Sequence, residues 1–155
     1  LSSQGCRKIL YLYDALTYSG SQKLKGFGSG LVECGIDAHE ELIQQVEKSI
    51  LAAQQKTANV LKQIPNVSAI VASEDLLAIG AQKALAAIDI QLPIIGFNNS
   101  HYAECATPSL TSVDNMLNSL RQTAIDLLAD ILAGKDAPQK IMISAKLVER
   151  QTFRL

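Results

Sequence analysis

Residues 68–114, SAIVASEDLLAIGAQKALAAIDIQLPIIGFNNSHYAECATPSLTSVD, decide the fold of this chain. They contain two apolar segments typical of strands, 68–72 and 92–97, with an alanine-rich helical segment between them. Polar residues follow each strand at once, SED at 73–75 and NNS at 98–100. Because the carboxyl ends of parallel strands meet at one edge of an open α/β sheet, we expect these polar groups to form a small-ligand site.

The bulk composition is that of an ordinary globular protein and argues against several classes of function. The chain has 155 residues, 48% hydrophobic and 19% charged, and 14 basic against 15 acidic residues give a net charge of −1. This length suits one domain, and so balanced a charge gives no broad basic field for nucleic acid. No apolar run approaches the about 18 residues that span a membrane, so no membrane partner is expected.

The first residues and the cysteines indicate the setting of the chain. The segment LSSQG at 1–5 has no initiator Met and lacks the basic-then-apolar pattern of a secretory signal, so we expect a piece of a longer protein. Cys6, Cys34 and Cys105 are far apart and form no Cys-x-x-Cys pair. This spacing favours reduced thiols in the cytoplasm over a disulfide framework or a zinc site.

Strand and helix alternate along the whole chain, which predicts a parallel sheet with helices on both faces. Further strands are predicted at 7–13, 41–46 and 141–151. Helices are predicted at 24–32 (ended by Gly35), 49–63, 75–88 and 116–133. Connections are predicted at 14–20 and 108–114. The predicted inward side of the last helix is formed by Leu117, Leu120, Ala124, Leu127, Leu128 and Ile131.

No pattern of residues indicates a catalytic or metal site. The glycines in GFGSG at 26–30 lack the Lys-Ser/Thr ending of a phosphate loop, and we favour close packing of a helix on the sheet instead. His39 and His101 are the only histidines, and their polar surroundings favour surface positions. With no nucleophile motif and no metal-ligand cluster, we expect neither an enzyme nor a cofactor.

The polar residues at the strand ends each have a structural alternative. Asp75 is expected to stabilise the helix N-terminus, whereas Glu74 is equally consistent with a cap and a ligand contact. Asn98 and Asn99 offer donors and acceptors together, which suits a hydroxyl-rich ligand, but they also suit an Asx-type turn.

The helix at 76–88 is apolar nearly all round, although a helix packed on one sheet face needs a single apolar stripe. The surplus indicates a second buried face, either against a second subunit or under another part of the same chain. If that face is a subunit contact, Leu85→Glu is expected to turn a dimer into monomers without unfolding it.

Five blocks of sequence share their order and spacing with one family of proteins. They are KLKGF (23–27), IVASEDLLAIG (70–80), LPIIGFNN (92–99), PSLTSV (108–113) and KLVERQT (146–152). Over essentially its whole length the chain resembles the effector-binding domain of LacI/GalR-type transcription regulators. The resemblance implies a periplasmic-binding-protein-like fold, a small-molecule effector, a homodimer, and DNA binding through a helix-turn-helix absent from this sequence.

The same resemblance divides the chain and assigns its site. It implies that 1–113 form the C-terminal lobe of the effector domain, that 114–144 cross to the other lobe, and that 145–155 form a C-terminal strand and tail. A ligand between the lobes would shift their closure and alter operator affinity. The implied effector contacts are Thr17, Ser19, Lys23, Glu74 and Asn98.

Three of these contacts depart from the residues usual in the family. Lys23 stands where Arg is usual, Glu74 where Asn is common, and Asn98 where an acid is usual. A Lys point charge lacks the planar bidentate grip of Arg. No aromatic residue stands at 46–49, where some members of the family stack a ring on the ligand. The segment GFNNS at 96–100 resembles the corresponding segment of maltose-type regulators. We therefore expect a neutral sugar as effector; the alternative is a sugar-binding component of uptake or chemotaxis.

Overall fold

A six-stranded sheet lies at the centre of the computed structural model, which describes residues 1–154. The strand order is β2-β1-β3-β4-β5-β6; the first five strands run parallel and β6 is antiparallel to β5. The strands are β1 (Ile9–Tyr13), β2 (Ile43–Gln45), β3 (Ala69–Ala72), β4 (Ile94–Phe97), β5 (Thr111–Asp114) and β6 (Lys146–Val148). The predicted α/β architecture with a parallel sheet is confirmed.

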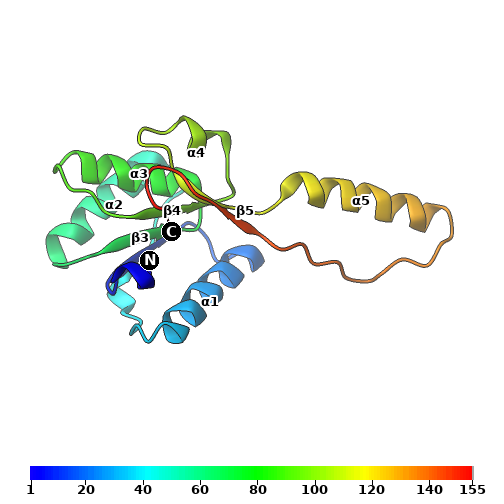
Figure 1. The fold of residues 1–155 in the computed structure, drawn as a ribbon, viewed down its shortest axis with the longest axis horizontal. Coiled ribbons are helices and arrows are strands. Elements are labelled where there is room, and N and C mark those ends of the chain that lie inside the picture. The colour runs from blue at the N-terminus through cyan, green and yellow to red at the C-terminus, as the bar shows by residue number, and fades with distance from the viewer. Residues whose placement is uncertain (155) are drawn as a thin grey trace.

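Helices cover both faces of the sheet, as predicted. Figure 1 shows α2 and α3 on one side, α1 on the other, and α5 extending away from the rest of the molecule. The helices are α1 (Tyr18–Glu33), α2 (Ile50–Gln63), α3 (Asp75–Ala86), α4 (His101–Cys105) and α5 (Leu117–Leu132), with 3₁₀ turns at Ser2–Gln4 and Glu40–Leu42. Among residues 1–154 no helix combines the length and the apolar character that crossing a membrane requires.

The side chains of β1 point alternately to the two faces of the sheet and pack in two separate cores. Leu10 and Leu12 are buried in the larger core, between the sheet and the α2–α3 layer. Ile9 points to the other face and joins a smaller core under α1. A parallel strand buried on both faces needs apolar side chains at successive positions, which is why ILYLY is an unbroken apolar run.

The second buried face of α3 packs against α2 of the same chain, so the own-chain alternative is the right one. At Gly80 a Cβ would lie 2.5 Å from Ala53 Cβ and 2.5 Å from Ile50 O, so only glycine allows this approach of the two helices. Leu85 is 4% exposed within the larger core. The expectation that Leu85→Glu separates subunits without unfolding is therefore wrong.

Two expectations about α1 are also corrected. The helix begins at Tyr18, inside the predicted 14–20 connection, because Thr17 Oγ1 accepts a hydrogen bond from Gly20 N at 3.1 Å and caps the first turn. The expected close packing of the glycines at 26–30 is wrong, since a Cβ on Gly26, Gly28 or Gly30 would meet no atom within 4 Å. The predicted end of the helix is confirmed, with Gly35 in the left-handed region at φ +63°.

The predictions for the C-terminal third were the least accurate. The 108–114 connection contains β5, and α4 was not predicted at all. The last strand is limited to Lys146–Val148 rather than 141–151. Residues 1–154 do not cover the predicted inward side of α5: no residue of α5 is buried, and Leu117, Leu120, Leu128 and Ile131 are 42–57% exposed. His39 and His101 are exposed, as expected.

Tyr11 places a phenol hydroxyl in the interior beneath α1. The residue is 2% exposed, its ring stacks on Phe27 at 4.5 Å between centroids, and its hydroxyl has no hydrogen-bond partner among residues 1–154. Burial, with a smaller contribution from the charge of Asp14, raises the pKa of Tyr11 to about 12. Folding therefore favours the neutral phenol.

This raised pKa makes stability depend on pH at the alkaline end. The contribution of Tyr11 is complete below its ordinary pKa near 10 and is lost as the pH rises from about 10 through 12. Relative to Tyr11→Phe, the free energy of unfolding of the wild type is expected to fall by about 2 kcal/mol between pH 9 and pH 11.5. Denaturant titrations of both proteins measure the difference, and parallel pH profiles would contradict it.

Candidate functional site at the carboxyl edge of the sheet

Polar side chains from three elements meet at the carboxyl edge of the sheet. Lys23 reaches from α1, Glu74 follows β3, and Asn98 follows β4. Lys23 Nζ lies 3.3 Å from Glu74 Oε1 and 3.4 Å from Asn98 Oδ1, and Asn98 Nδ2 donates to Glu74 Oε2 at 2.8 Å. Three of the residues that the sequence predicted as effector contacts thus form one closed cluster, which we call the strand-end cluster.

The turn after β4 gives the Asn98 side chain its place in the strand-end cluster. Asn98 has φ +98° and Asn99 has φ +47°, both in the left-handed region that asparagine tolerates better than most residues. The backbone turns here without the hydrogen bond of an Asx-type turn, because Ser100 N donates to Asp75 Oδ2 and the Asn98 amide meets Glu74. Asn99 N donates to Ser112 Oγ at 2.9 Å and so ties the turn to β5.

Sequence reasoning missed two members of the site, Lys48 and Asn115. Lys48 Nζ lies 3.0 Å from Glu74 Oε2 and 3.7 Å from Asp14 Oδ2, and Asn115 Nδ2 donates to Asn98 Oδ1 at 2.6 Å. Both residues follow the carboxyl end of a strand, Lys48 after β2 and Asn115 after β5. The same strand-end rule would have found them, but β5 was not predicted and Lys48 stands three residues beyond its strand.

The charges of the site balance one another. Lys23 and Lys48 face Glu74 and Asp14, so two cations meet two carboxylates. The hydrogen bond with Glu74 raises the pKa of Lys48 above its ordinary value, with the charges of Glu74 and Asp14 adding to the effect. Lys48 therefore stays protonated at neutral pH, and the site presents donors and acceptors without an excess charge.

Thr17 and Ser19 have different places from the other predicted contacts. The Thr17 hydroxyl caps α1. Ser19 is exposed and lines a cavity of about 690 Å³ together with Lys23, Phe97 and Asn115. Within residues 1–154 neither side chain is hydrogen-bonded to the strand-end cluster. Ser19 thus borders the same open space as Lys23, whereas Thr17 has a structural role at the start of α1.

The Asp75 side chain does not cap α3; it accepts hydrogen bonds from the turn after β4 and from β5. The residue is 2% exposed, and the helix cap position belongs to Glu74. Asp75 Oδ2 accepts from Ser100 N at 2.7 Å and Oδ1 accepts from Ser112 Oγ at 2.6 Å. The expected capping hydrogen bond is not formed, because the carboxylate connects α3 to the turn after β4 and to β5. Asp75 does stand in the first turn of α3, where the helix dipole favours a negative charge as expected.

The strand-end cluster, as the structure describes it, does not group the side chains that typically hold a metal ion. Within the part of the chain that the structure describes, no three His, Cys, Asp or Glu side chains are grouped to hold a metal ion. The strand-end cluster and Asn115 together offer hydrogen-bonding groups beside an open cavity: the Lys23 ammonium, the Asn98 and Asn115 amides and the Glu74 carboxylate. Such groups orient the hydroxyls of a small ligand.

The chain matches a known domain family along nearly its whole length. A family model described as a periplasmic binding protein-like domain matches residues 1–153. An HTH-type transcriptional regulator of Lachnoclostridium phytofermentans is 38% identical over 98% of this chain and 47% of its own length. The HTH-type transcriptional regulator MalR of Clostridium butyricum is 28% identical over 84% of this chain and 40% of its own. The chain thus spans about half the length of the curated relatives it matches, or less.

A solved structure has the same fold. The crystal structure of a sugar-binding transcriptional regulator (LacI family) from Escherichia coli, complexed with phosphate, has a TM-score of 0.88 and 28% sequence identity to this chain. The match covers 97% of this chain and 56% of that one. The chain belongs to the periplasmic binding protein-like domain family, in the group that includes the LacI-type transcriptional regulators.

Proposed function

We propose that the chain is the effector-sensing part of a LacI-type transcriptional regulator, and that the strand-end cluster binds the effector. The observation that carries the proposal is the closed contact of Lys23, Glu74 and Asn98 at the carboxyl edge of the sheet. This edge is where open α/β sheets bind small ligands. The relatives, which are named as HTH-type transcriptional regulators, supply the regulatory role.

A neutral sugar fits the chemistry of the site. Amide, carboxylate and ammonium groups alternate within hydrogen-bond distance, so vicinal hydroxyls find both donors and acceptors. The neighbouring cavity adds apolar surface from Phe97, Leu117 and Leu120, which suits the apolar face of a sugar ring. The similarity to a regulator described as sugar-binding supports the same ligand class.

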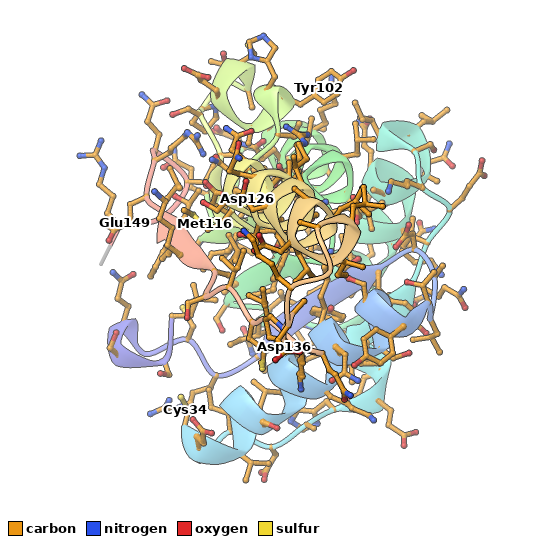
Figure 2. All side chains as sticks on the ribbon, turned by 90° about the vertical axis from the view of Figure 1, so that its right-hand side faces the viewer. Cys34, Tyr102, Met116, Asp126, Asp136 and Glu149 are labelled. Carbon is orange, nitrogen blue, oxygen red and sulfur yellow. The ribbon has the colours of Figure 1, made fainter. Side chains whose placement is uncertain are left out.

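The exposed apolar side of α5 supports the proposed division of the chain. Figure 2 looks at the molecule from the end where α5 projects, with Met116 labelled at the start of the helix and Asp136 beyond its end. Apolar residues left in water on a helix of this kind normally have a partner. The exposed apolar side chains of this segment are Leu117, Leu120, Ile125, Leu128, Ile131, Leu132, Ile141 and Met142.

We assign this partner to the half of the protein that the chain does not span. In this assignment residues 1–113 form one lobe, 114–144 pack on the other lobe, and 145–155 return to the sheet through β6. The ligand would lie between the lobes and shift their closure. A homodimer, DNA binding through a helix-turn-helix outside this chain, a cytoplasmic location and the absence of catalysis complete the proposal. The relatives, named as HTH-type transcriptional regulators, support its DNA-binding part.

A thermal-shift screen of the full-length protein against neutral mono- and disaccharides tests the ligand class. A sugar present at 100 times its dissociation constant should stabilise the protein by about 2.7 kcal/mol. Glu74→Gln is expected to remove this shift, because the carboxylate at the centre of the strand-end cluster is lost. Asp136→Asn, on the exposed segment after α5, is the control with the same charge change. A wild-type response that survives Glu74→Gln would remove Glu74 from the site.

A further inference from the structure

Three glycines weaken helix α1, and the packing around them does not require any of the three. Gly26, Gly28 and Gly30 lie inside the helix, and a Cβ on each would meet no atom within 4 Å. Compared with alanine, one glycine in a helix interior makes the helical state about fivefold less favourable. Together the three glycines favour an open form of α1 about 100-fold more than three alanines would.

The side chains that hold α1 on the sheet lie on one stripe of the helix. Lys23, Phe27 and Leu31 are spaced four residues apart and therefore share one side. Leu31 is buried in the smaller core, the Phe27 ring stacks on Tyr11, and Lys23 Nζ donates to Ser73 O at 2.8 Å. The larger core lies on the opposite face of the sheet, under α2 and α3 (Figure 1). Helix α1 can therefore leave the sheet while the larger core stays intact.

The hydroxyl of Tyr11 also opposes the closed position of α1. This hydroxyl is buried beneath the helix and has no hydrogen-bond partner among residues 1–154. Burying a polar group without a partner is unfavourable, and water reaches this hydroxyl once α1 moves away. Two independent features thus weaken the closed position: the glycines of the helix and the unpaired hydroxyl beneath it.

We infer that α1 is a cover that opens locally in the protein without effector and that the effector closes; the closure by effector rests on the proposed function. Lys23 Nζ lies 3.3 Å from Glu74 Oε1 and 3.4 Å from Asn98 Oδ1 while α1 lies on the sheet. A ligand that contacts Lys23 together with Glu74 or Asn98 binds this closed form better, and the difference in affinity shifts α1 toward it. Binding at the strand-end cluster thus orders a helix of 16 residues as well as the side chains that the ligand contacts.

Hydrogen exchange of the backbone amides, measured by mass spectrometry on the full-length protein without ligand, tests the opening. Amides of α1 should exchange at least about tenfold faster than those of α2, which packs in the larger core. The triple variant Gly26→Ala, Gly28→Ala, Gly30→Ala should slow exchange in α1 about 100-fold, and Tyr11→Phe should slow it about tenfold. Ser29→Ala, an exposed change in the same helix, is the control and should slow it less than about threefold.

Two results of this experiment would overturn the inference. Equal protection of α1 and α2 in the wild type would mean that α1 opens only when the whole protein unfolds. A triple variant whose α1 exchanges as fast as in the wild type, or faster, would mean that the glycines do not control the opening or that another part of the full-length protein packs against them.

The same measurement with the sugar that gives the largest shift in the neutral-sugar screen tests the closure. At 100 times its dissociation constant, this sugar should slow exchange in α1 of the wild type about 100-fold, because opening would release it. A sugar that binds the protein but leaves exchange in α1 unchanged would overturn the closure, and the proposed function would stand. If no neutral sugar binds, the proposed function and the closure both fall, and the experiment without ligand still decides whether α1 opens.

Discussion

Asp75→Ala is expected to destabilise the protein by about 3–5 kcal/mol, because two hydrogen bonds to a buried carboxylate are lost together. The carboxylate accepts from Ser100 N and Ser112 Oγ, at 2.7 and 2.6 Å, and Ser112 is itself buried. Removing the carboxylate leaves the Ser112 hydroxyl without its acceptor in the interior. The turn that carries Asn98 loses its contact through Ser100 N at the same time and keeps the hydrogen bond from Asn99 N to Ser112 Oγ.

Denaturant unfolding of the wild type and of Asp75→Ala measures this loss. Asp136→Ala removes a carboxylate from an exposed position and should change stability by less than about 0.5 kcal/mol. Asp75→Asn keeps the shape of the side chain but presents an N–H where Ser100 N or Ser112 Oγ needs an acceptor, so it should recover only part of the stability. A loss below about 1 kcal/mol for Asp75→Ala would show that the carboxylate does not connect α3 to β5 as described.

Leu85→Glu is expected to prevent stable folding, with a cost of about 4 kcal/mol or more. Leu85 is 4% exposed in the core between the sheet, α2 and α3, so the substitution deletes apolar contacts and places a carboxylate without a partner among apolar side chains. An unpaired charge in such a site is among the most destabilising single changes.

Circular dichroism and thermal melting compare Leu85→Glu with Ile88→Glu, a matched change just beyond the end of α3, where the side chain is half exposed. Ile88→Glu should fold and melt close to the wild type. If Leu85→Glu folds with a wild-type melting temperature and only its oligomeric state changes, Leu85 lies at a subunit surface and the packing of α3 described here is incorrect.

The sequence was sufficient to predict the strands β1 to β4 and the approach of Glu74 and Asn98 at their carboxyl edge, because both depend on local patterns. Continuous apolar runs such as ILYLY identify buried parallel strands, and the residue after such a strand lies at the carboxyl edge wherever the chain goes next. That rule alone brought Glu74 and Asn98 together. The position of Lys23 came from the family resemblance, and its contact with both residues agrees with it.

The errors concern features that depend on distant parts of the molecule. An amphipathic pattern shows which side of α5 is apolar, but it does not show what covers that side. The role of Asp75 depends on Ser112, 37 residues further along the chain. Ser112 lies in β5, a short and mostly polar strand, TSVD, that lacks the usual apolar pattern. Lys48 was missed for a similar reason, since its partners Glu74 and Asp14 come from other strand ends.

The central claim is that a small ligand at the strand-end cluster changes the DNA affinity of the full-length regulator. Fluorescence polarisation with an operator selected from random DNA measures that affinity in the presence and absence of the sugar that stabilises the protein most. The account predicts that the sugar changes the DNA affinity of the wild type at least fivefold, which is the lower end of usual allosteric coupling. Without sugar, Glu74→Gln should bind DNA as the wild type does. Adding the sugar should leave the DNA affinity of Glu74→Gln unchanged. A sugar that binds the protein but leaves the DNA affinity of the wild type unchanged would contradict it.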